Sequence, residues 1–158
     1  MKRIIYSMLL IVATFAFVGC DEDSNDLSKN LTEGKMAMKI GDGAAETLEC
    51  TYIDYGGEVF ITAVTTSGSM VSIMYGDYSN TTPLSVRTYS TATEADKMYV
   101  TTSYGYADSY TNSDAVVSVK ITKVTDTVIE GELSGKILTS EGNLVTIAAA
   151  FKATEVTP

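Results

Sequence analysis

The sequence predicts an all-β domain. From Gly34 onward, short runs of apolar and β-branched residues are separated by Gly, Asp, Asn and Ser at intervals of about ten residues. Polar and apolar residues alternate within these runs, and helical periodicity is nearly missing. We therefore expect nine strands: Lys35 to Ile40, Ala45 to Ile53, Glu58 to Thr66, Met70 to Tyr75, Leu84 to Tyr89, Lys97 to Tyr106, Ala115 to Val124, Val128 to Leu138 and Asn143 to Ala153.

Alternation is clearest in the last three of these strands. Ser118, Lys120 and Thr122 lie on the opposite face from the apolar residues between them. One buried face and one wet face are typical of an antiparallel sheet. The apolar positions are Val117, Val119 and Ile121, then Ile129, Leu133 and Ile137, and then Val145, Ile147, Ala149 and Phe151.

The segments between the runs carry turn residues. The turn segments Gly41-Asp42-Gly43, Tyr55-Gly56-Gly57 and Ser67-Gly68-Ser69 supply the positive φ that hairpins need, and Asp126-Thr127 separates two alternating runs. One helical signal is present, because Thr91 and Glu94 are spaced as in a capping box. We expect consecutive hairpins and a single helical turn between two of the strands.

Two architectures fit nine strands of similar length with no helix long enough for a parallel crossover. We favour a β-sandwich of two antiparallel sheets. A closed or partly open β-barrel is the alternative, because consecutive hairpins also close on themselves. Residues 34–158 number about 125, which is enough for one domain with its own core.

The N-terminus resembles a bacterial lipoprotein signal peptide. Lys2 and Arg3 precede an apolar run, residues 4–18, and small Gly19 stands directly before Cys20. The run has fifteen residues, fewer than the roughly 20 that span a bilayer core, which favours a cleaved leader over a transmembrane anchor.

The lipoprotein resemblance implies that the mature chain begins at Cys20, with a thioether-linked diacylglycerol and an acylated amine. Phe17 departs from the pattern, since Leu is usual there. We expect a signal peptide at 1–19, a flexible tether at 20–33 and one β-domain at 34–158.

An acidic run follows the cysteine. Residues 21–26 contain four acidic side chains and no apolar one, so they bury nothing that would offset the entropy of ordering. Asp21, Glu22 and Asp23 resemble the signal that exports lipoproteins of Bacteroidetes-type bacteria to the cell surface. The resemblance implies an outer-membrane location facing outward, the periplasmic face being the alternative.

A further resemblance covers residues 115–153. The alternating segment 119–124, Asp126 and the segment 129–135 form a hairpin pattern that precedes a last strand with an aromatic at Phe151. This pattern is similar to that of small Bacteroidetes-type outer-membrane lipoproteins of unknown function. The resemblance implies an all-β envelope lipoprotein and no particular activity.

Composition excludes several classes of function. The formal net charge is −9, and about −11 once Lys2 and Arg3 are removed with the leader, which disfavours nucleic acid and anionic lipid. Histidine is absent, so no Ser-His-Asp triad and no His-ligated metal site can form. With Cys20 acylated, Cys50 has no disulfide partner, and we expect it to be a small buried hydrophobe. We expect no catalysis, no metal and no cofactor.

The most unusual segment, residues 98–114, holds four of the ten tyrosines. Tyr104 and Tyr106 are expected to share a face with Met98 and Val100, and Tyr99 to take the other. An exposed pair of tyrosines beside polar side chains would stack on a sugar and bind its hydroxyls, whereas packing within the sheet is the alternative role. The candidate partner-binding residues are Tyr99, Tyr104, Tyr106, Tyr110, Asp108 and Asn112.

Two further segments carry residues suited to metal binding or to modification. Oxygen ligands at Asp108, Asn112 and Asp114 lack the spacing of a known calcium loop, so no metal site is expected. Asp126-Thr127-Val128 resembles the acceptor of O-glycosylation in Bacteroidetes-type periplasms, which makes Thr127 a candidate modification site.

Together these features predict a non-catalytic, lipid-anchored envelope lipoprotein whose β-domain binds a glycan or a protein partner. The alternative is a structural or accessory subunit of an outer-membrane complex. A glycosidase that uses two carboxylates needs no histidine, but no particular pair of acidic residues is singled out.

Overall fold

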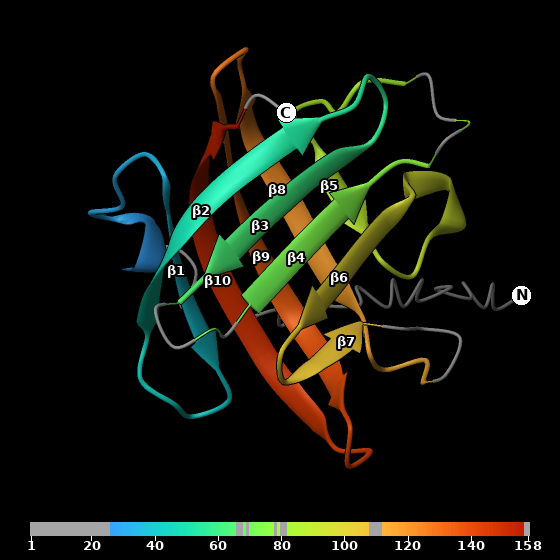
Figure 1. The fold of residues 1–158 in the computed structure, drawn as a ribbon. Helices are drawn as coiled ribbons and strands as arrows, with labels where there is room; N and C mark the ends of the chain where they lie inside the picture. The colour runs from blue at the N-terminus through green and yellow to red at the C-terminus, as the bar shows by residue number, and fades with distance from the viewer. Residues whose placement is uncertain are drawn as a thin grey trace, which may run out of the picture.

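The computed structural model describes residues 26–65, 68, 70–77, 79, 82–107 and 112–156. Residues 26–28 are helical, and ten strands and a short 3₁₀ helix follow them in the described part of the chain (Figure 1). They are β1 (Lys35–Ile40), β2 (Glu46–Asp54), β3 (Val59–Val64), β4 (Met70–Tyr75), β5 (Thr88–Ser90), η1 (Glu94–Asp96), β6 (Met98–Thr102), β7 (Gly105–Ala107), β8 (Val117–Val124), β9 (Val128–Thr139) and β10 (Leu144–Glu155).

The strands close into a β-barrel. Eight of them form the ring β1-β2-β3-β4-β6-β7-β9-β10, which returns to β1 because β1 pairs with both β2 and β10. Near the end of β10, Thr154 and Glu155 also pair in parallel with β2. The prediction of an all-β fold is confirmed, and the architecture is the barrel, not the favoured sandwich. The alternation of polar and apolar residues does not distinguish a sandwich from a barrel, because both architectures bury one face of every strand.

The remaining two strands branch from the ring. β8 pairs with β9 through residues 117–124, on the edge of β9 that β7 joins farther along at Leu138 and Thr139. β5 pairs with β8, and the sheet ends there. The barrel wall between β5 and β4 or β6 therefore has no strand-to-strand ladder, and this gap is called the seam below.

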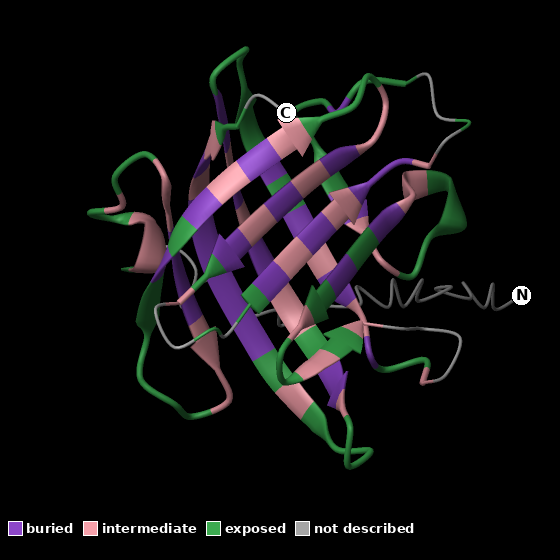
Figure 2. Ribbon diagram, in the orientation of Figure 1, coloured by how far each residue is buried: buried purple, intermediate pink, exposed green. Residues whose placement is uncertain are grey.

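The inside of the barrel is filled with apolar side chains. Successive residues of each strand point alternately inward and outward, as the banding along β2, β3, β4 and β6 in Figure 2 shows. The largest fully buried side chains are Tyr89, Phe151, Met36, Leu48, Ile73, Ile121, Ile129, Leu133, Ile137 and Ile147.

One predicted strand is two strands in the structure. The run Lys97 to Tyr106 divides into β6 and β7, because the chain turns at Ser103 and Tyr104. The Thr102 hydroxyl accepts hydrogen bonds from the amides of Tyr104 and Gly105, both at 3.0 Å, and donates to the Gly105 carbonyl. A threonine that bonds the backbone two and three residues ahead stabilises a turn.

The predicted helical turn is present without its predicted cap. η1 begins at Glu94, and Thr93 before it makes no side-chain capping bond. Thr91 is committed elsewhere, because its hydroxyl accepts the Val117 amide at 3.0 Å. The strand predicted at Leu84 to Tyr89 is also shorter than expected and is limited to β5.

Gly131 is a point of close packing inside the barrel. A Cβ at this position would lie 2.6 Å from the Phe151 ring and 2.7 Å from the Lys120 carbonyl oxygen. Gly131 pairs with Phe151 on β10 and with Ile121 on β8, so both neighbouring strands come close because it has no side chain.

Replacement of this glycine tests the packing. We expect Gly131→Ala to lower the free energy of unfolding in urea by about 2–3 kcal/mol, because the methyl group must displace a ring and a backbone oxygen. Gly142→Ala is the control, since nothing lies within 4 Å of its added Cβ and only its positive φ of 81° carries a cost of about 1 kcal/mol. Equal losses in the two variants would contradict the close packing at Gly131.

Candidate functional site

The candidate tyrosines lie on the outside of the barrel. Tyr99, Tyr104 and Tyr106 are 48%, 44% and 38% exposed, whereas Met98 and Val100 are buried in the core. The prediction that Tyr104 and Tyr106 share the face of Met98 was wrong, because the turn at Thr102 reverses the chain. Tyr106 then lies opposite Thr101, which faces outward beside Tyr99.

Of the other predicted partner-binding residues, Asn112 lies in the described part of the chain. Asn112 is committed to a turn, since its side-chain oxygen accepts the Asp114 amide at 2.9 Å. Asp108 and Tyr110 lie outside the described residues, as do Cys20 and the acidic residues Asp21, Glu22 and Asp23.

Tyr99 belongs to a row of outward-facing apolar residues that crosses four strands. Ile53 of β2 pairs with Phe60 of β3, Phe60 with Met74 of β4, and Met74 with Tyr99 of β6. The Tyr55 ring packs edge-on against the Phe60 ring, with centroids 5.9 Å apart. The row is continuous because each residue lies opposite the next across the sheet, where cross-strand neighbours are in contact distance.

A second row, made of hydroxyl groups, crosses the same strands two residues away from the apolar row. Thr51 pairs with Thr62, Thr62 with Ser72, and Ser72 with Thr101. No hydrogen bond is recorded for any of these four side chains within the described parts of the chain. The two rows contain no charged residue, and together they are called the uncharged wall: Ile53, Phe60, Met74 and Tyr99 with Thr51, Thr62, Ser72 and Thr101.

The outer surface formed by β8, β9, β10 and β1 is different, because it carries ion pairs. Glu130 of β9 lies 2.9 Å from Lys123 of β8 and 4.0 Å from Lys152 of β10. Glu132 and Lys120 pair in the same way across β9 and β8. This side is called the ion-pair side. Figure 1 places β2, β3, β4 and β6 together on the front of the barrel, with β9 behind them.

Exposed hydrophobic side chains gather near the uncharged wall. Ten large hydrophobic residues are exposed in the described part of the chain, and six of them lie on the wall or at its border. Scattered exposed hydrophobics are normal, but a continuous group is typical of an interaction surface. The six are Tyr55, Val64, Met70, Tyr99, Tyr104 and Tyr106.

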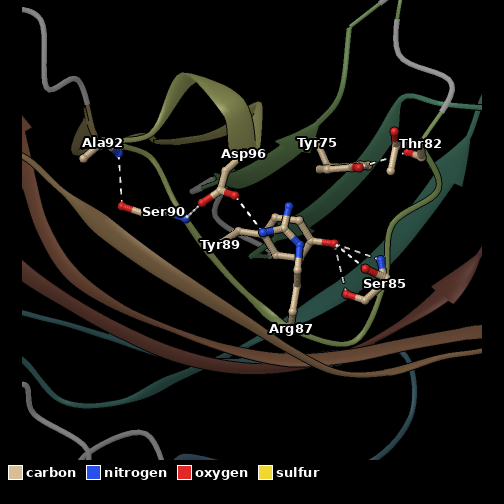
Figure 3. A network of polar contacts seen from close by, with 8 residues as sticks. All are labelled: Tyr75, Thr82, Ser85, Arg87, Tyr89, Ser90, Ala92 and Asp96. Carbon is tan, nitrogen blue, oxygen red and sulfur yellow. Dashed lines mark hydrogen bonds and ion pairs between the residues drawn. The ribbon is translucent and has the colours of Figure 1, made fainter.

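A polar network closes the seam, as Figure 3 shows. Asp96 accepts the backbone amide of Ser90 and the guanidinium of Arg87, each at 2.8 Å. The guanidinium lies 3.9 Å above the centre of the Tyr89 ring, which packs edge-on against Tyr75 at 5.3 Å. On the free edge of β5, the Asp96 carboxylate therefore accepts the backbone hydrogen bond that a neighbouring strand would otherwise accept.

The Tyr89 hydroxyl completes this network. It accepts the Ser85 amide at 2.9 Å and donates to the Ser85 carbonyl at 3.0 Å, and the Tyr75 hydroxyl donates to the Thr82 carbonyl at 2.9 Å. Both buried tyrosines thus satisfy their polar ends, as burial requires.

A polar pocket of about 280 Å³ opens at the seam, lined among others by Tyr75, Arg87, Asp96 and Lys97. Its two cations already have partners, since Lys97 lies 2.8 Å from Asp77. Hydrogen bonds from Lys97 and then Ser79 lower the pKa of Asp77 to about 2. These charges are used in holding the loop before β5 against η1, so the pocket serves closure of the barrel.

Cys50 fits its predicted role. It is fully buried, and burial raises the pKa of its thiol to about 12. A nucleophilic cysteine needs a lowered pKa, so this residue contributes packing alone.

Thr127 lies in the exposed turn between β8 and β9. Two backbone carbonyl oxygens hold the turn. That of Asp126 accepts a hydrogen bond from the Tyr52 hydroxyl at 2.9 Å, and that of Thr127 accepts one from the Glu155 amide at 3.1 Å. The hydroxyl of Thr127 is in an accessible place, and its modification stays a prediction.

The described residues contain neither a metal-binding cluster nor a membrane-spanning helix. They contain no group of three or more acidic, cysteine or histidine side chains that could hold a metal ion. No described helix has the length and apolarity needed to cross a bilayer.

Comparison of the chain with protein-family models, with curated proteins and with solved structures finds no match. The site must therefore be interpreted from its own geometry.

The sequence contained a signal for the uncharged wall. The segment Val59–Val64 is apolar at five of its six positions and does not alternate. In an antiparallel sheet with one wet face, such a run indicates apolar residues on the outer side. The alignment of Phe60 with Met74 and Tyr99 depends on strand register, which no single run contains.

The seam predicts the effect of removing Asp96. We expect Asp96→Ala to lower the free energy of unfolding by about 2–3 kcal/mol, because the Ser90 amide and the Arg87 guanidinium both lose their acceptor. Asp96→Asn keeps an oxygen for Ser90 and should cost about 1 kcal/mol. Urea denaturation measures both.

Asp114→Ala is the matched control for this experiment, because the Asp114 side chain is exposed and a change of less than about 0.5 kcal/mol is expected there. A loss at Asp96 no larger than that at Asp114 would mean that the seam does not depend on the carboxylate.

Proposed function

We propose that this chain is a non-catalytic lipoprotein, anchored through Cys20 in the outer membrane and facing outward, whose barrel binds a glycan or a protein partner through the uncharged wall. The observation that carries the proposal is the gathering of exposed tyrosine and apolar side chains on one side of an acidic barrel. A continuous uncharged surface of this kind favours recognition of a partner over simple solvation.

The interior of the barrel supports recognition at its outside. The described core side chains, among them Tyr89, Phe151 and Met36, occupy the space in which a small-molecule carrier would hold its ligand. The pocket at the seam is lined by paired charges. The hydroxyl groups of the uncharged wall, by contrast, make no hydrogen bond among the described residues.

The anchor is supported by the sequence pattern around Cys20. β1 starts at Lys35, so residues 21–34 would join the anchored cysteine to the barrel. A partner in the envelope or outside the cell would then meet the wall without release of the protein.

One experiment tests both parts of the proposal in a Bacteroidetes-type host. We expect the wild-type chain to fractionate with outer membranes and to be cut by protease added to intact cells, and Cys20→Ser to move to the soluble fraction because it lacks the acyl chains. The double variant Met74→Ser with Tyr99→Ser should remain in the membrane and lose the partner that the wild type retains in detergent extracts.

Thr146→Ser is the control for the wall variant, because Thr146 is an exposed outward residue of β10 on the ion-pair side. Retention of Cys20→Ser in the membrane would refute the anchor, and full protection from protease would refute the outward orientation. Unchanged partner retention in the double wall variant would refute the role of the wall.

A further inference from the structure

The uncharged wall combines two kinds of surface in a regular arrangement. Its apolar row and its hydroxyl row both run across the strands, and neighbouring strands are about 4.8 Å apart. On the basis of the proposed function, we infer that the partner is a neutral glycan chain that lies across β2, β3, β4 and β6. Its sugar C–H faces would pack on the apolar row, and its hydroxyls would bind the hydroxyl row.

The apolar row provides a platform of the right shape. Phe60 is half-buried between its neighbours and is held by the Tyr55 ring, so it is a fixed surface. Tyr99 is 48% exposed and forms one end of the row. Aromatic side chains provide large contact area with little loss of conformational entropy, which suits the flat apolar face of a sugar ring.

The hydroxyl row provides hydrogen bonds without prior commitments. A hydroxyl both donates and accepts, as the hydroxyls of a sugar do. No hydrogen bond is recorded for Thr62, Ser72 or Thr101 within the described residues, and Tyr106 continues the row beside Thr101. A sugar could therefore bind here without breaking any bond that holds the barrel together.

Charge favours a neutral glycan over an anionic one. The chain has a formal net charge of −9, and its cations on the opposite side are engaged with Glu130 and Glu132. A polyanion would approach an acidic protein without any cation on the wall to bind it.

The topology argues against a peptide strand as the occupant. β2, β3 and β4 each pair with a strand on both edges, and β6 pairs with β4 and, at Val100 and Thr101, with β7, so most of their backbone groups are used within the sheet. Strand addition needs a free edge. A partner would therefore contact the side chains of the uncharged wall, which are apolar residues in one row and hydroxyl groups in the other.

The test is affinity electrophoresis of the full chain in a non-ionic detergent, in native gels that contain soluble starch, mannan, a mixed-linkage β-glucan or polygalacturonate. We expect at least one neutral polysaccharide to retard the wild type, with polygalacturonate having no effect. Tyr99→Ser should weaken this binding about tenfold. Thr62→Val, which removes a hydroxyl and keeps the branched shape, should weaken it about fivefold.

Two matched variants separate binding from folding. Tyr99→Phe keeps the ring and should bind within about threefold of the wild type, and Thr146→Val makes the Thr62 change on the ion-pair side and should bind as the wild type does. Thermal unfolding by circular dichroism should be the same in all four variants, since each replaced side chain faces outward.

Absence of retardation in all neutral gels overturns the glycan inference, as does binding that Tyr99→Ser and Thr62→Val leave unchanged. Retardation by polygalacturonate to the same extent also overturns it. These failures differ from failure of the proposed function. If a protein partner is lost in the wall variants while every neutral polysaccharide is inert, the wall remains a binding surface and the glycan is excluded.

Discussion

Closure of the barrel at the seam is the constraint on which the rest of the structure depends. The ring of eight strands is closed by pairing, but β5, which branches from it through β8, has no strand beside its second edge, and there Asp96 binds the Ser90 amide and the Arg87 guanidinium. Tyr89 fills the barrel beneath this carboxylate. An open sheet edge is a site for pairing with other chains. Because the Asp96 side chain binds the Ser90 amide, the edge of β5 is less available for pairing with another chain. Recognition of a partner is then left to side chains on the outer surface.

Closure also divides the outer surface into two sides. Alternation requires every second residue to face outward, and register then decides which of these residues become neighbours. On β8, β9 and β10 the register brings Lys120, Lys123 and Lys152 beside glutamates. On β2, β3, β4 and β6 it aligns apolar residues with apolar residues and hydroxyls with hydroxyls. Exposed ion pairs add little to stability, so a gain in stability does not explain why one side of the barrel is charged and the other uncharged. We attribute the difference to the binding of a partner on the uncharged side.

The sequence predicted local features well and long-range features poorly. Alternation and turn glycines located β1 and β4 at their observed bounds, because these signals lie within a few residues. The choice between sandwich and barrel depends on pairings such as β7 with β9 and β10 with β2, which join residues far apart in the chain. Alternation placed Tyr99 on the face opposite Met98 and Val100, as observed, but Tyr106 changed face through the turn at Thr102. Phe60 and Thr62 were missed as site residues, since each becomes part of a row only through its neighbours across the sheet.

The central claim is that the uncharged wall, and not the ion-pair side, meets the partner in the cell. The most direct measurement is photocrosslinking in intact cells, with benzoylphenylalanine placed in turn at Thr62 on β3 and at Thr146 on β10. The probe inserts into nearby C–H bonds of either a glycan or a protein, so it does not depend on the class of partner. The account predicts a crosslinked product from position 62 and none from position 146. A product from position 146 alone, or equal products from both positions, would contradict it.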